Sequence, residues 1–378
     1  PMNHALAVFN AGSSSLKFAL YRTADCTLLC RGAVDNVAGD AAFAVTGPGA
    51  QPLAAFKVGS GHEAALESVL GWLEQSGLPP LAAAGHRIVH GGRDFAGPAR
   101  LHAETMAALR RLIPLAPLHQ PHNLAIVDAL ARRIPGLPQV ACFDTAFHRA
   151  QPRLNRMFAL PRALHEEGIE RYGFHGLSYE SVAGQLPSLL GPRGAGKVIA
   201  AHLGNGASLC AMEGGRSVAS TMGFSTLDGL MMGTRAGTVD AGVLFYLARE
   251  KGMSLEDIER LLYEESGLKG VSGISADMRT LLASSTPEAR EAVALYCLTA
   301  ARHVAALAAV LGGLDALVFT GGIGENQPGI RADICKPLRW LGVGGAVTVH
   351  TVKTREEDVI ARHAAAFLSG KPAGFTPS

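Results

Sequence analysis

The chain has 378 residues, of which 48% are hydrophobic and 17% charged, and this composition predicts a globular protein long enough for two domains. Its formal net charge of +2 is too close to zero for bulk electrostatic attraction to nucleic acid or a membrane surface, so we expect neither partner. Apolar residues start at Ala5 and are interrupted by Asn10, so we expect no signal peptide. The most apolar segment, 292–311, carries Arg302 and His303 and is interpreted as a buried helix.

The six cysteines are far apart and have no zinc-site spacing. Cys26 and Cys30 lie in a strand-like run, which would place them on one face of a strand but too far apart for a direct disulfide. We expect all six to be reduced thiols in a cytoplasmic protein.

The chain opens with a predicted hairpin whose turn is rich in amides and hydroxyls. Strands are expected at 6–9 and 16–21, joined by the turn at 10–15, with Lys17 close behind it. The same order of strand, Asn/Gly/Ser turn and strand recurs at 198–212, about 195 residues later. This repeat predicts two related domains, and glycine-rich turns of this kind can bring backbone N–H groups close to an anion.

A helix is predicted at 62–75, followed by a short strand that enters a Gly-Gly turn within 85–93. His86 and His90 would have zinc-ligand spacing on a helix, but the Ile-Val content favours a strand and argues against such a site. Arg87, at the end of this strand, is the better candidate for binding an anion.

Asn123 is predicted to cap a helix with its body at 124–133. A buried strand at 140–143 then ends on Asp144. In α/β folds the carboxyl end of a strand is where metal-binding and catalytic carboxylates lie, although a helix N-cap is an equally good interpretation of this residue.

A glycine-framed aromatic turn holds His175, and Ser178 is predicted to cap a helix that runs to about residue 190. Farther on, Arg235 stands between two glycines in a glycine-rich segment. Its guanidinium could bind phosphate or carboxylate with two hydrogen bonds, and the alternative is a solvated arginine on a surface loop.

The last third of the chain alternates helices with glycine-rich segments. Helices are predicted at 255–265 and 287–311, and a loop at 272–279 leads into another helix. A strand at 316–319 continues into a loop at 320–326, an order typical of nucleotide binding although no Walker lysine is present. A strand at 346–352 and a helix at 357–368, capped by 354–357, complete the chain.

Ten motifs, in order along almost the whole chain, resemble those of the acetate kinase family, also called the acetate/propionate kinases. They are FNAGSSSLK (9–17), GHRIVHGG (85–92), LAPLHQPHN (115–123), FDTAFH (143–148), RYGFHG (171–176), HLGNGAS (202–208), MGFSTLDGLMMGTRAG (222–237), SGISADMR (272–279), FTGGIGEN (319–326) and TREEDVIA (354–361). The family belongs to the actin/hexokinase-like superfamily. The resemblance therefore implies an α/β fold of two duplicated actin/ribonuclease H-like domains with a central interdomain cleft.

The resemblance implies an N-terminal domain formed by 1–148 with 359–378, and a C-terminal nucleotide-binding domain formed by 149–358. It also implies reversible, Mg-ATP-dependent phosphorylation of acetate to acetyl phosphate. The expected cofactor is Mg²⁺, with Mn²⁺ as the alternative. The expected assembly is a cytoplasmic homodimer, with acetate and ATP as its ligands.

Site residues follow from the resemblance by position in the motifs. The catalytic residues are expected to be Arg87, Asp144, His175 and Arg235, with Asn10 and Glu356 at the metal. The acetate pocket is expected to be formed by Arg87, Val89, Leu118 and Phe174. The nucleotide is expected to contact Lys17, His202, Leu203, Gly204, Asn205, Gly206, Asp277, Met278, Arg279, Gly322, Ile323, Gly324 and Asn326. Two departures concern Thr226, where the family usually has proline, and Met278, where an aromatic is commoner.

The chemistry supports this interpretation independently of the resemblance. A carboxylic acid is ionised at pH 7, so its attack on phosphorus needs charge neutralisation and no general base. Propionate kinase is the nearest alternative. A sugar or polyol kinase of the same superfamily would need an aspartate to accept a hydroxyl proton, and Asp144 could serve. An ATP-switched clamp of the actin or chaperone type would not need Arg87, His175 and Arg235. Direct transfer and a phospho-Glu356 intermediate both remain open.

Overall fold

The computed structural model describes residues 4–12 and 14–370, so Ser13 of the first hairpin turn and residues 371–378 of the expected N-terminal domain lie outside the described residues. The chain forms two compact units, of which unit 1 contains residues up to Phe147 and resumes at Arg355, and unit 2 runs from His148 to Thr354. Glu356 therefore belongs to unit 1. The domain boundaries expected from the sequence, at 148/149 and 358/359, stay a prediction.

Unit 1 is built on an eight-stranded mixed sheet in the order β5-β4-β3-β2-β1-β6-β8-β7. Strands β1 to β5 form an antiparallel meander, while β6 runs parallel to both β1 and β8. The strands are β1 Ala5–Ala11, β2 Ser15–Arg22, β3 Leu28–Asp35, β4 Ala42–Thr46, β5 Pro52–Lys57, β6 Leu81–Ile88, β7 Ala99–Arg100 and β8 Gln139–Phe143. The carboxyl ends of β1, β6 and β8 consequently lie at the same edge of the sheet.

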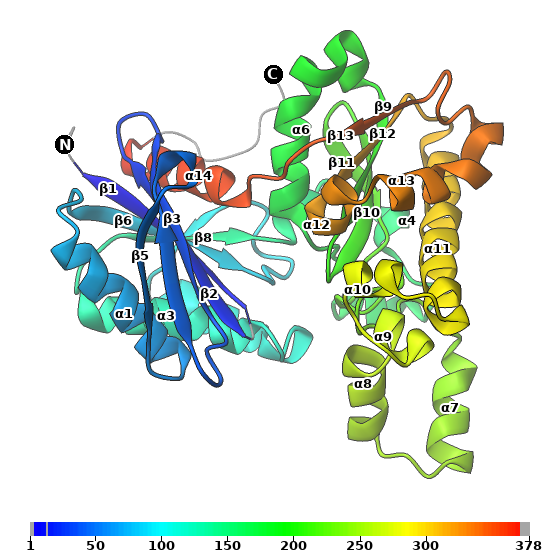
Figure 1. The fold of residues 1–378 in the computed structure, drawn as a ribbon, viewed down its shortest axis with the longest axis horizontal. Helices are drawn as coiled ribbons and strands as arrows, with labels where there is room; N and C mark the ends of the chain where they lie inside the picture. The colour runs from blue at the N-terminus through cyan, green and yellow to red at the C-terminus, as the bar shows by residue number, and fades with distance from the viewer. Residues whose placement is uncertain (1–3, 13, 371–378) are drawn as a thin grey trace. The chain divides into compact units, whose positions relative to one another are not determined.

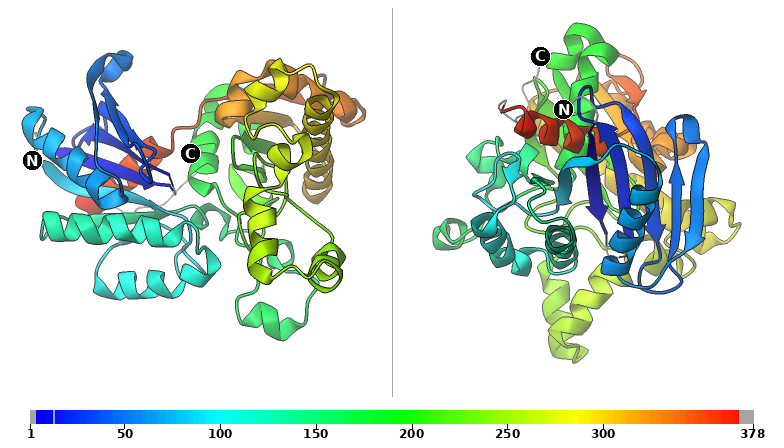
Figure 2. Two further views of the ribbon diagram at one scale, coloured as in Figure 1. Left: turned by 60° about the horizontal axis from the view of Figure 1, so that its bottom comes forward. Right: turned by 90° about the vertical axis from the view of Figure 1, so that its left-hand side faces the viewer.

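The helices of unit 1 cover both faces of this sheet. Helices α1 (His62–Gln75) and α3 (Gln120–Arg133) pack against each other and on the strands, and α14 (Glu356–Leu368) packs on β1, β6 and β8 from the other side (Figure 1). Helix α2 (Ala103–Arg111) lies against α3, and Figure 2 shows this layering from two further directions. Phe9, Phe18 and Phe43 of the strands are buried under α1 in the core.

Unit 2 has a five-stranded mixed sheet in the order β11-β10-β9-β12-β13. Its strands are β9 Lys197–Leu203, β10 Ala207–Glu213, β11 Arg216–Ser220, β12 Ala316–Thr320 and β13 Thr348–Thr351. Helices α6 (Gly176–Leu190) and α11 (Pro287–Leu311) lie on opposite sides of this sheet in Figure 1. The remaining helices are α4 Arg153–Arg156, α5 Arg162–Glu166, α7 Ala241–Glu250, α8 Leu255–Glu264, α9 Gly267–Ser272, α10 Met278–Ala283, α12 Gly321–Asn326 and α13 Pro328–Cys335.

The two sheets share one topology. In unit 1 the order β3-β2-β1-β6-β8 consists of two antiparallel pairings followed by two parallel ones. In unit 2 the order β11-β10-β9-β12-β13 repeats these pairings in the same sequence. The predicted α/β fold and its internal duplication are therefore confirmed.

Several elements match the prediction from sequence, and others differ. Helices α1 and α11 have the bounds expected for them. The segment 321–326 was expected to be a loop, but it forms the short helix α12. Cys26 lies in a turn with φ 54°, while Cys30 lies in β3, so the expectation that both share one strand face is wrong. The prediction of free thiols is confirmed for all six cysteines.

Two predicted helix caps are also wrong. Asn123 lies inside α3, which begins at Gln120 after the N-cap His119. Ser178 lies inside α6, where the N-cap is His175. In both places the side chain that resembles a cap makes a tertiary hydrogen bond instead, to Val89 N–H and to His202 respectively.

Helix α11 is, among the described residues, the one helix long and apolar enough to cross a membrane by length and composition alone. Ten of its residues are buried, and it packs on β9, β10 and β11. A core helix passes the same test, so this feature is weak evidence for a membrane span.

Candidate active site

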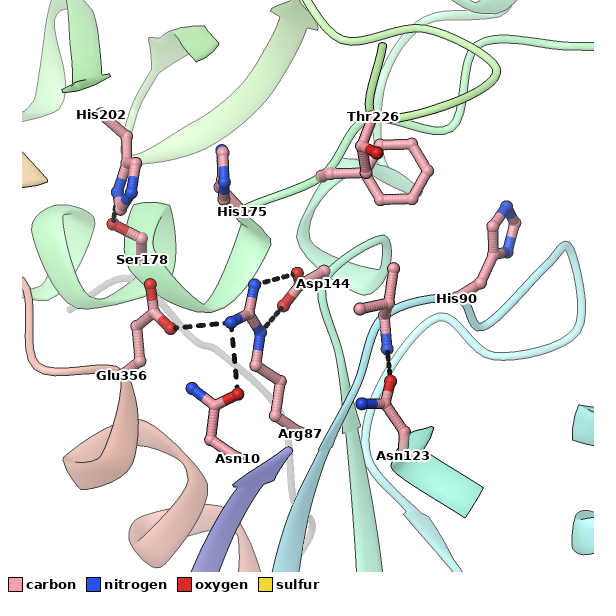
Figure 3. Close-up of polar contacts among 12 residues, drawn as sticks. Asn10, Arg87, His90, Asn123, Asp144, His175, Ser178, His202, Thr226 and Glu356 are labelled. Carbon is pink, nitrogen blue, oxygen red and sulfur yellow. Dashed lines mark hydrogen bonds and ion pairs between the residues drawn. The ribbon is translucent and has the colours of Figure 1, made fainter. Parts of the chain in front are cut away.

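Arg87 is the centre of a polar cluster at the carboxyl edge of the sheet in unit 1. Its Nε donates to Oδ1 of Asp144 at 2.9 Å, and its Nη2 donates to Oδ2 at 2.6 Å. Its Nη1 lies 3.4 Å from Oδ1 of Asn10 and 3.8 Å from Oε2 of Glu356 (Figure 3). Three adjacent parallel strands and the first residue of α14 thus bring together four residues expected in the site.

Burial gives this cluster unusual electrostatics. The side chain of Asp144 is 3% exposed and that of Glu356 13% exposed, so water screens their charges weakly. Burial raises the pKa of Glu356 to about 7, with Arg87 opposing the shift and Asp144 adding to it. Burial alone would lower the pKa of Arg87, but the carboxylates of Asp144 and Glu356 outweigh burial and raise it.

The oxygen atoms of this cluster suit Mg²⁺. Within the described part of the chain there is no group of three or more His, Cys, Asp and Glu residues placed to hold a metal. Nucleotide-bound Mg²⁺, however, commonly uses only one or two carboxylates together with phosphate oxygens and waters. The carboxylate of Glu356 and the amide oxygen of Asn10, both beside Nη1 of Arg87, form a donor set of this kind.

Asn123 fixes the backbone next to this cluster, a role that the sequence prediction missed. Its Oδ1 accepts from Val89 N–H at 2.9 Å, and its Nδ2 donates to the carbonyl of Ala11 at 2.8 Å. It therefore ties the end of β6 to the end of β1.

Val89 itself is 6% exposed, whereas Leu118, in the segment before α3, is 40% exposed. Lys17 is exposed on β2, opposite Asn10.

His175 lies in unit 2, at the N-cap of α6. Its backbone is left-handed, with φ 58° and ψ 23°, a conformation that costs a non-glycine residue about 1–2 kcal/mol. Its Nδ1 lies 2.8 Å from Oγ of Ser208, and its ring stacks on that of His202 with 4.3 Å between centroids. Ser178 Oγ in turn contacts His202 Nδ1 at 2.8 Å (Figure 3). The neighbouring Phe174 is buried, and its carbonyl lies 2.9 Å from Nε2 of His148.

The turn between β9 and β10 contains the expected phosphate-binding residues. It comprises buried Leu203, half-buried Gly204 and Gly206, and exposed Asn205. A Cβ on Gly206 would lie 3.5 Å from Nε2 of His175 and 3.8 Å from Nη1 of Arg235, so both side chains reach this turn. Gly233 N–H donates to the carbonyl of Asn205 at 3.1 Å.

Arg235 is a half-buried cation that has no carboxylate partner in the described part of the chain. Its Nη1 donates to the carbonyl of Thr226 at 3.1 Å, and the ring of Tyr263 lies 6.0 Å from its guanidinium carbon. Across residues 4–12 and 14–370, no carboxylate pairs with it, and burial lowers its pKa. Because a desolvated charge without a partner is costly, this guanidinium favours the binding of an anion.

Two further segments of unit 2 approach the same turn. A Cβ on Gly233 would overlap the side chain of Asn205 and lie 3.3 Å from the carbonyl of Ala276, next to the expected nucleotide-binding residues 277–279. Gly321, with φ 80°, begins α12, and a Cβ there would lie 2.7 Å from the carbonyl of Leu203. At Gly321 the left-handed backbone and the nearby carbonyl allow only glycine.

The expected nucleotide-binding residues in these two segments differ in how far their side chains are exposed. Met278 is 2% exposed and belongs to the core, whereas the side chain of Arg279 is 79% exposed and pairs with Asp277. Asn326 Nδ2 donates to the carbonyl of Gly322 within α12, which also contains Ile323 and Gly324. Glu325, which the sequence prediction missed, accepts from Gly321 N–H and Thr354 N–H and so fixes the start of α12.

Comparisons with known proteins agree with this geometry. Residues 5–368 match the model of the acetokinase family. The chain is 50% identical to the acetate kinase of Rhodopseudomonas palustris, over 96% of this chain and 98% of that protein. It is 42% identical to the acetate kinase of Rhizobium meliloti, over 97% and 98%.

Two solved structures are also similar along almost their whole length. The crystal structure of Porphyromonas gingivalis acetate kinase is 34% identical, with a TM-score of 0.87, over 97% of this chain and 100% of that one. That of a propionate kinase from Francisella tularensis is 34% identical, with a TM-score of 0.88, over 95% and 98%. With its duplicated sheets, its Arg87 cluster and a match over residues 5–368, the chain belongs to the acetokinase family.

Proposed function

We propose that this chain is an acetate kinase, which transfers the terminal phosphoryl group of ATP to acetate, reversibly, to form acetyl phosphate and ADP. Membership of the acetokinase family and 50% identity to a protein named acetate kinase support the assignment. A propionate kinase structure is similar at 34% identity, so propionate is the nearest alternative acceptor.

The observation that carries the proposal is that Arg87 binds both carboxylate oxygens of Asp144. A kinase that phosphorylates a sugar hydroxyl needs a carboxylate to accept the hydroxyl proton. Here Asp144 is the candidate, but both of its oxygens accept hydrogen bonds from Arg87 and its side chain is 3% exposed. An acetate acceptor is ionised at pH 7 and has no proton to lose, so it matches a site whose aspartate is already occupied.

The residues of each unit would act mainly by charge neutralisation and positioning. In unit 1, Arg87 would bind the acetate carboxylate or the transferred phosphoryl group while Asp144 holds its guanidinium in a fixed orientation. In unit 2, Arg235 would neutralise phosphoryl oxygens, since it has no carboxylate partner among the described residues. His175 and the 203–206 turn would donate hydrogen bonds to phosphate oxygens.

Asn10 and Glu356 would hold Mg²⁺. The bound ion would neutralise charge on the nucleotide phosphates. Asp277, Arg279 and residues of α12 would contact the adenosine, which supports ATP over pyrophosphate as the phosphoryl donor.

The experiment is an acceptor and donor panel. ADP release and hydroxamate formation are measured with acetate, propionate, butyrate, glycerol and glucose, each with ATP, and with acetate and pyrophosphate. We expect hydroxamate from acetate with ATP, less from propionate and little from butyrate. Faster ADP release with glycerol or glucose would support the sugar or polyol kinase instead. Faster acetyl phosphate formation with pyrophosphate would overturn the choice of donor.

The homodimer is also proposed. It is supported by helix α7, which has no buried residue and exposes Val243, Phe245 and Tyr246 by 44%, 59% and 54%. Apolar side chains gathered in this way often mark an interface. A monomer mass in light scattering at micromolar concentration would contradict the dimer. The cytoplasmic location and the absence of nucleic-acid and membrane partners stay predictions.

A further inference from the structure

Behind His175, unit 2 contains a buried chain of hydroxyl groups that the sequence analysis did not assign. Ser208 Oγ lies 2.8 Å from His175 Nδ1 and 2.5 Å from the hydroxyl of Tyr179. Ser208 and Tyr179 are both fully buried, on β10 and α6 respectively. Because water cannot replace a missing partner there, the direction of each hydrogen bond can be worked out from the groups present.

In the hydrogen bond between Tyr179 and Ser208, Tyr179 is the donor. Its hydroxyl is fully buried, so the phenol proton needs an acceptor inside the protein. For the proton of Tyr179, Ser208 Oγ is the only acceptor found among the described residues. If Ser208 donated to Tyr179 instead, the phenol proton would be buried without an acceptor, which is unfavourable.

This assignment also determines the donor in the hydrogen bond between Ser208 and His175. Ser208 accepts from Tyr179, so its single proton is left for His175 Nδ1, the other partner that lies within hydrogen-bond distance of its Oγ. His175 Nδ1 is therefore an acceptor, and a neutral His175 carries its proton on Nε2. Nε2 is the atom that faces Gly206, near Nη1 of Arg235.

We infer that Tyr179 and Ser208 are positioning residues that hold His175 in the Nε2–H tautomer and orient it, so that Nε2–H donates to a phosphoryl oxygen beside Arg235. The role in catalysis rests on the proposed function, whereas the tautomer does not depend on it. The other tautomer would turn a lone pair toward an anionic oxygen and would repel it. A donor fixed before the substrate arrives also avoids reorganisation during the reaction.

The first test determines the tautomer of His175 by a measurement that does not depend on kinase activity. Long-range ¹H–¹⁵N spectra of the full chain, labelled with ¹⁵N-histidine and recorded at pH 8, distinguish the two neutral tautomers and the charged ring. The variant His175→Gln assigns the signals. We expect the Nε2–H form in the wild type and a mixture of tautomers in Tyr179→Phe and Ser208→Ala. An Nδ1–H form or a charged ring in the wild type would overturn the inference.

The second test reads the consequence for catalysis. A single oxyanion donor is worth roughly 10²–10³ in kcat, so a donor that is present but misplaced should cost about 10- to 100-fold. We expect this loss in Tyr179→Phe and in Ser208→Ala, with KM for ATP and acetate changed by less than about three-fold, because ground-state binding is not the main role of the donor. Ser208→Thr keeps the hydroxyl and should restore most of kcat.

The matched control is Tyr296→Phe. Tyr296 is also a buried tyrosine of unit 2, and its hydroxyl has no partner among the described residues, so this change should leave both kcat and the spectra of His175 as in the wild type. If Tyr179→Phe behaves like this control in kcat and in the spectra, the positioning role is wrong. A wild type inactive with acetate would instead refute the proposed function, and the spectra would still decide the tautomer.

Discussion

Both oxygens of Asp144 accept from one guanidinium, that of Arg87, although Arg87 lies in β6, Asp144 follows β8, and the two are 57 positions apart in the chain. Parallel pairing of β6 with β8 places Arg87 beside Cys142 and so brings Asp144 within reach. The pair is largely buried, so removing one partner leaves the other charge uncompensated.

For this pair we predict that Asp144→Asn and Arg87→Ala each lower kcat by roughly 10²–10⁵, because an arginine that neutralises charge in phosphoryl transfer contributes about 10³–10⁵. Steady-state kinetics with ATP and acetate measures the loss, and circular dichroism confirms the fold. Asp128→Asn is the control, because Asp128 also binds an arginine, Arg110, through both oxygens, but at an exposed position. Exposed pairs contribute little, so this variant should match the wild type. Retention of more than about a tenth of kcat in Arg87→Ala would remove Arg87 from the catalytic residues.

We expect replacement of Arg235 in unit 2 to lower kcat as much as replacement of Arg87 does. Arg235→Ala removes a guanidinium that has no carboxylate partner among the described residues, and kcat should fall by roughly 10²–10⁵. Arg235→Lys keeps the charge but loses the planar fork, so it should recover only part of the loss. The control is Arg249→Ala, which removes an exposed arginine that lies over the ring of Phe245. Equal kcat in the Arg235 and Arg249 variants would contradict a catalytic role for Arg235.

His86 should make the stability of unit 1 depend on pH. It is 2% exposed and stacks on Phe9, and burial lowers its pKa from 6.5 to about 4. Between these values the unfolded chain binds a proton that the folded chain does not, so stability falls as the pH falls. The slope is about 1.4 kcal/mol per pH unit, or about 3 kcal/mol across the window.

The measurement is the free energy of unfolding in urea at several pH values from 4 to 6.5. His86→Phe keeps an aromatic ring beside Phe9 and has no titratable group, so its curve should be flatter than that of the wild type. Other groups titrate in both proteins and cancel in the comparison. Parallel curves for the two proteins would show that His86 does not cause the loss.

The sequence predicted the elements whose signal is local. Helix α11 follows from an alanine-rich segment between Thr286 and Gly312, which both act as caps in the structure. The two hairpins follow from apolar strands around a glycine- or serine-rich turn. These patterns depend on neighbouring residues only, so they can be seen without the fold.

The prediction failed where a tertiary partner decides what a residue does. Asn123 and Ser178 have the chemistry of N-caps, but Asn123 Oδ1 accepts from Val89 N–H 34 positions away and Ser178 contacts His202. The resemblance to a family suggested Arg87 and Asp144 as site residues, but not that they bind each other. Ser208 lies inside a recognised motif, and only the packing of α6 on β9 and β10 shows its contact with Tyr179.

Val89 should set the length of the carboxylate that the site accepts. It is 6% exposed, and its amide is held by Asn123, so truncating the side chain should enlarge the space beside it without moving the backbone. One methylene is worth about 1–3 kcal/mol in an apolar pocket, or roughly 10- to 200-fold in kcat/KM. Val89→Ala should therefore raise the ratio of kcat/KM for propionate to that for acetate at least several-fold. The control is Val127→Ala, which removes the same two methyl groups from a buried position on α3 packed among Ile88, Leu124 and Phe143, and should leave the ratio unchanged. An unchanged ratio in Val89→Ala, or a wild type that prefers propionate, would place the determinant elsewhere, and Thr226→Pro would be the next variant to measure.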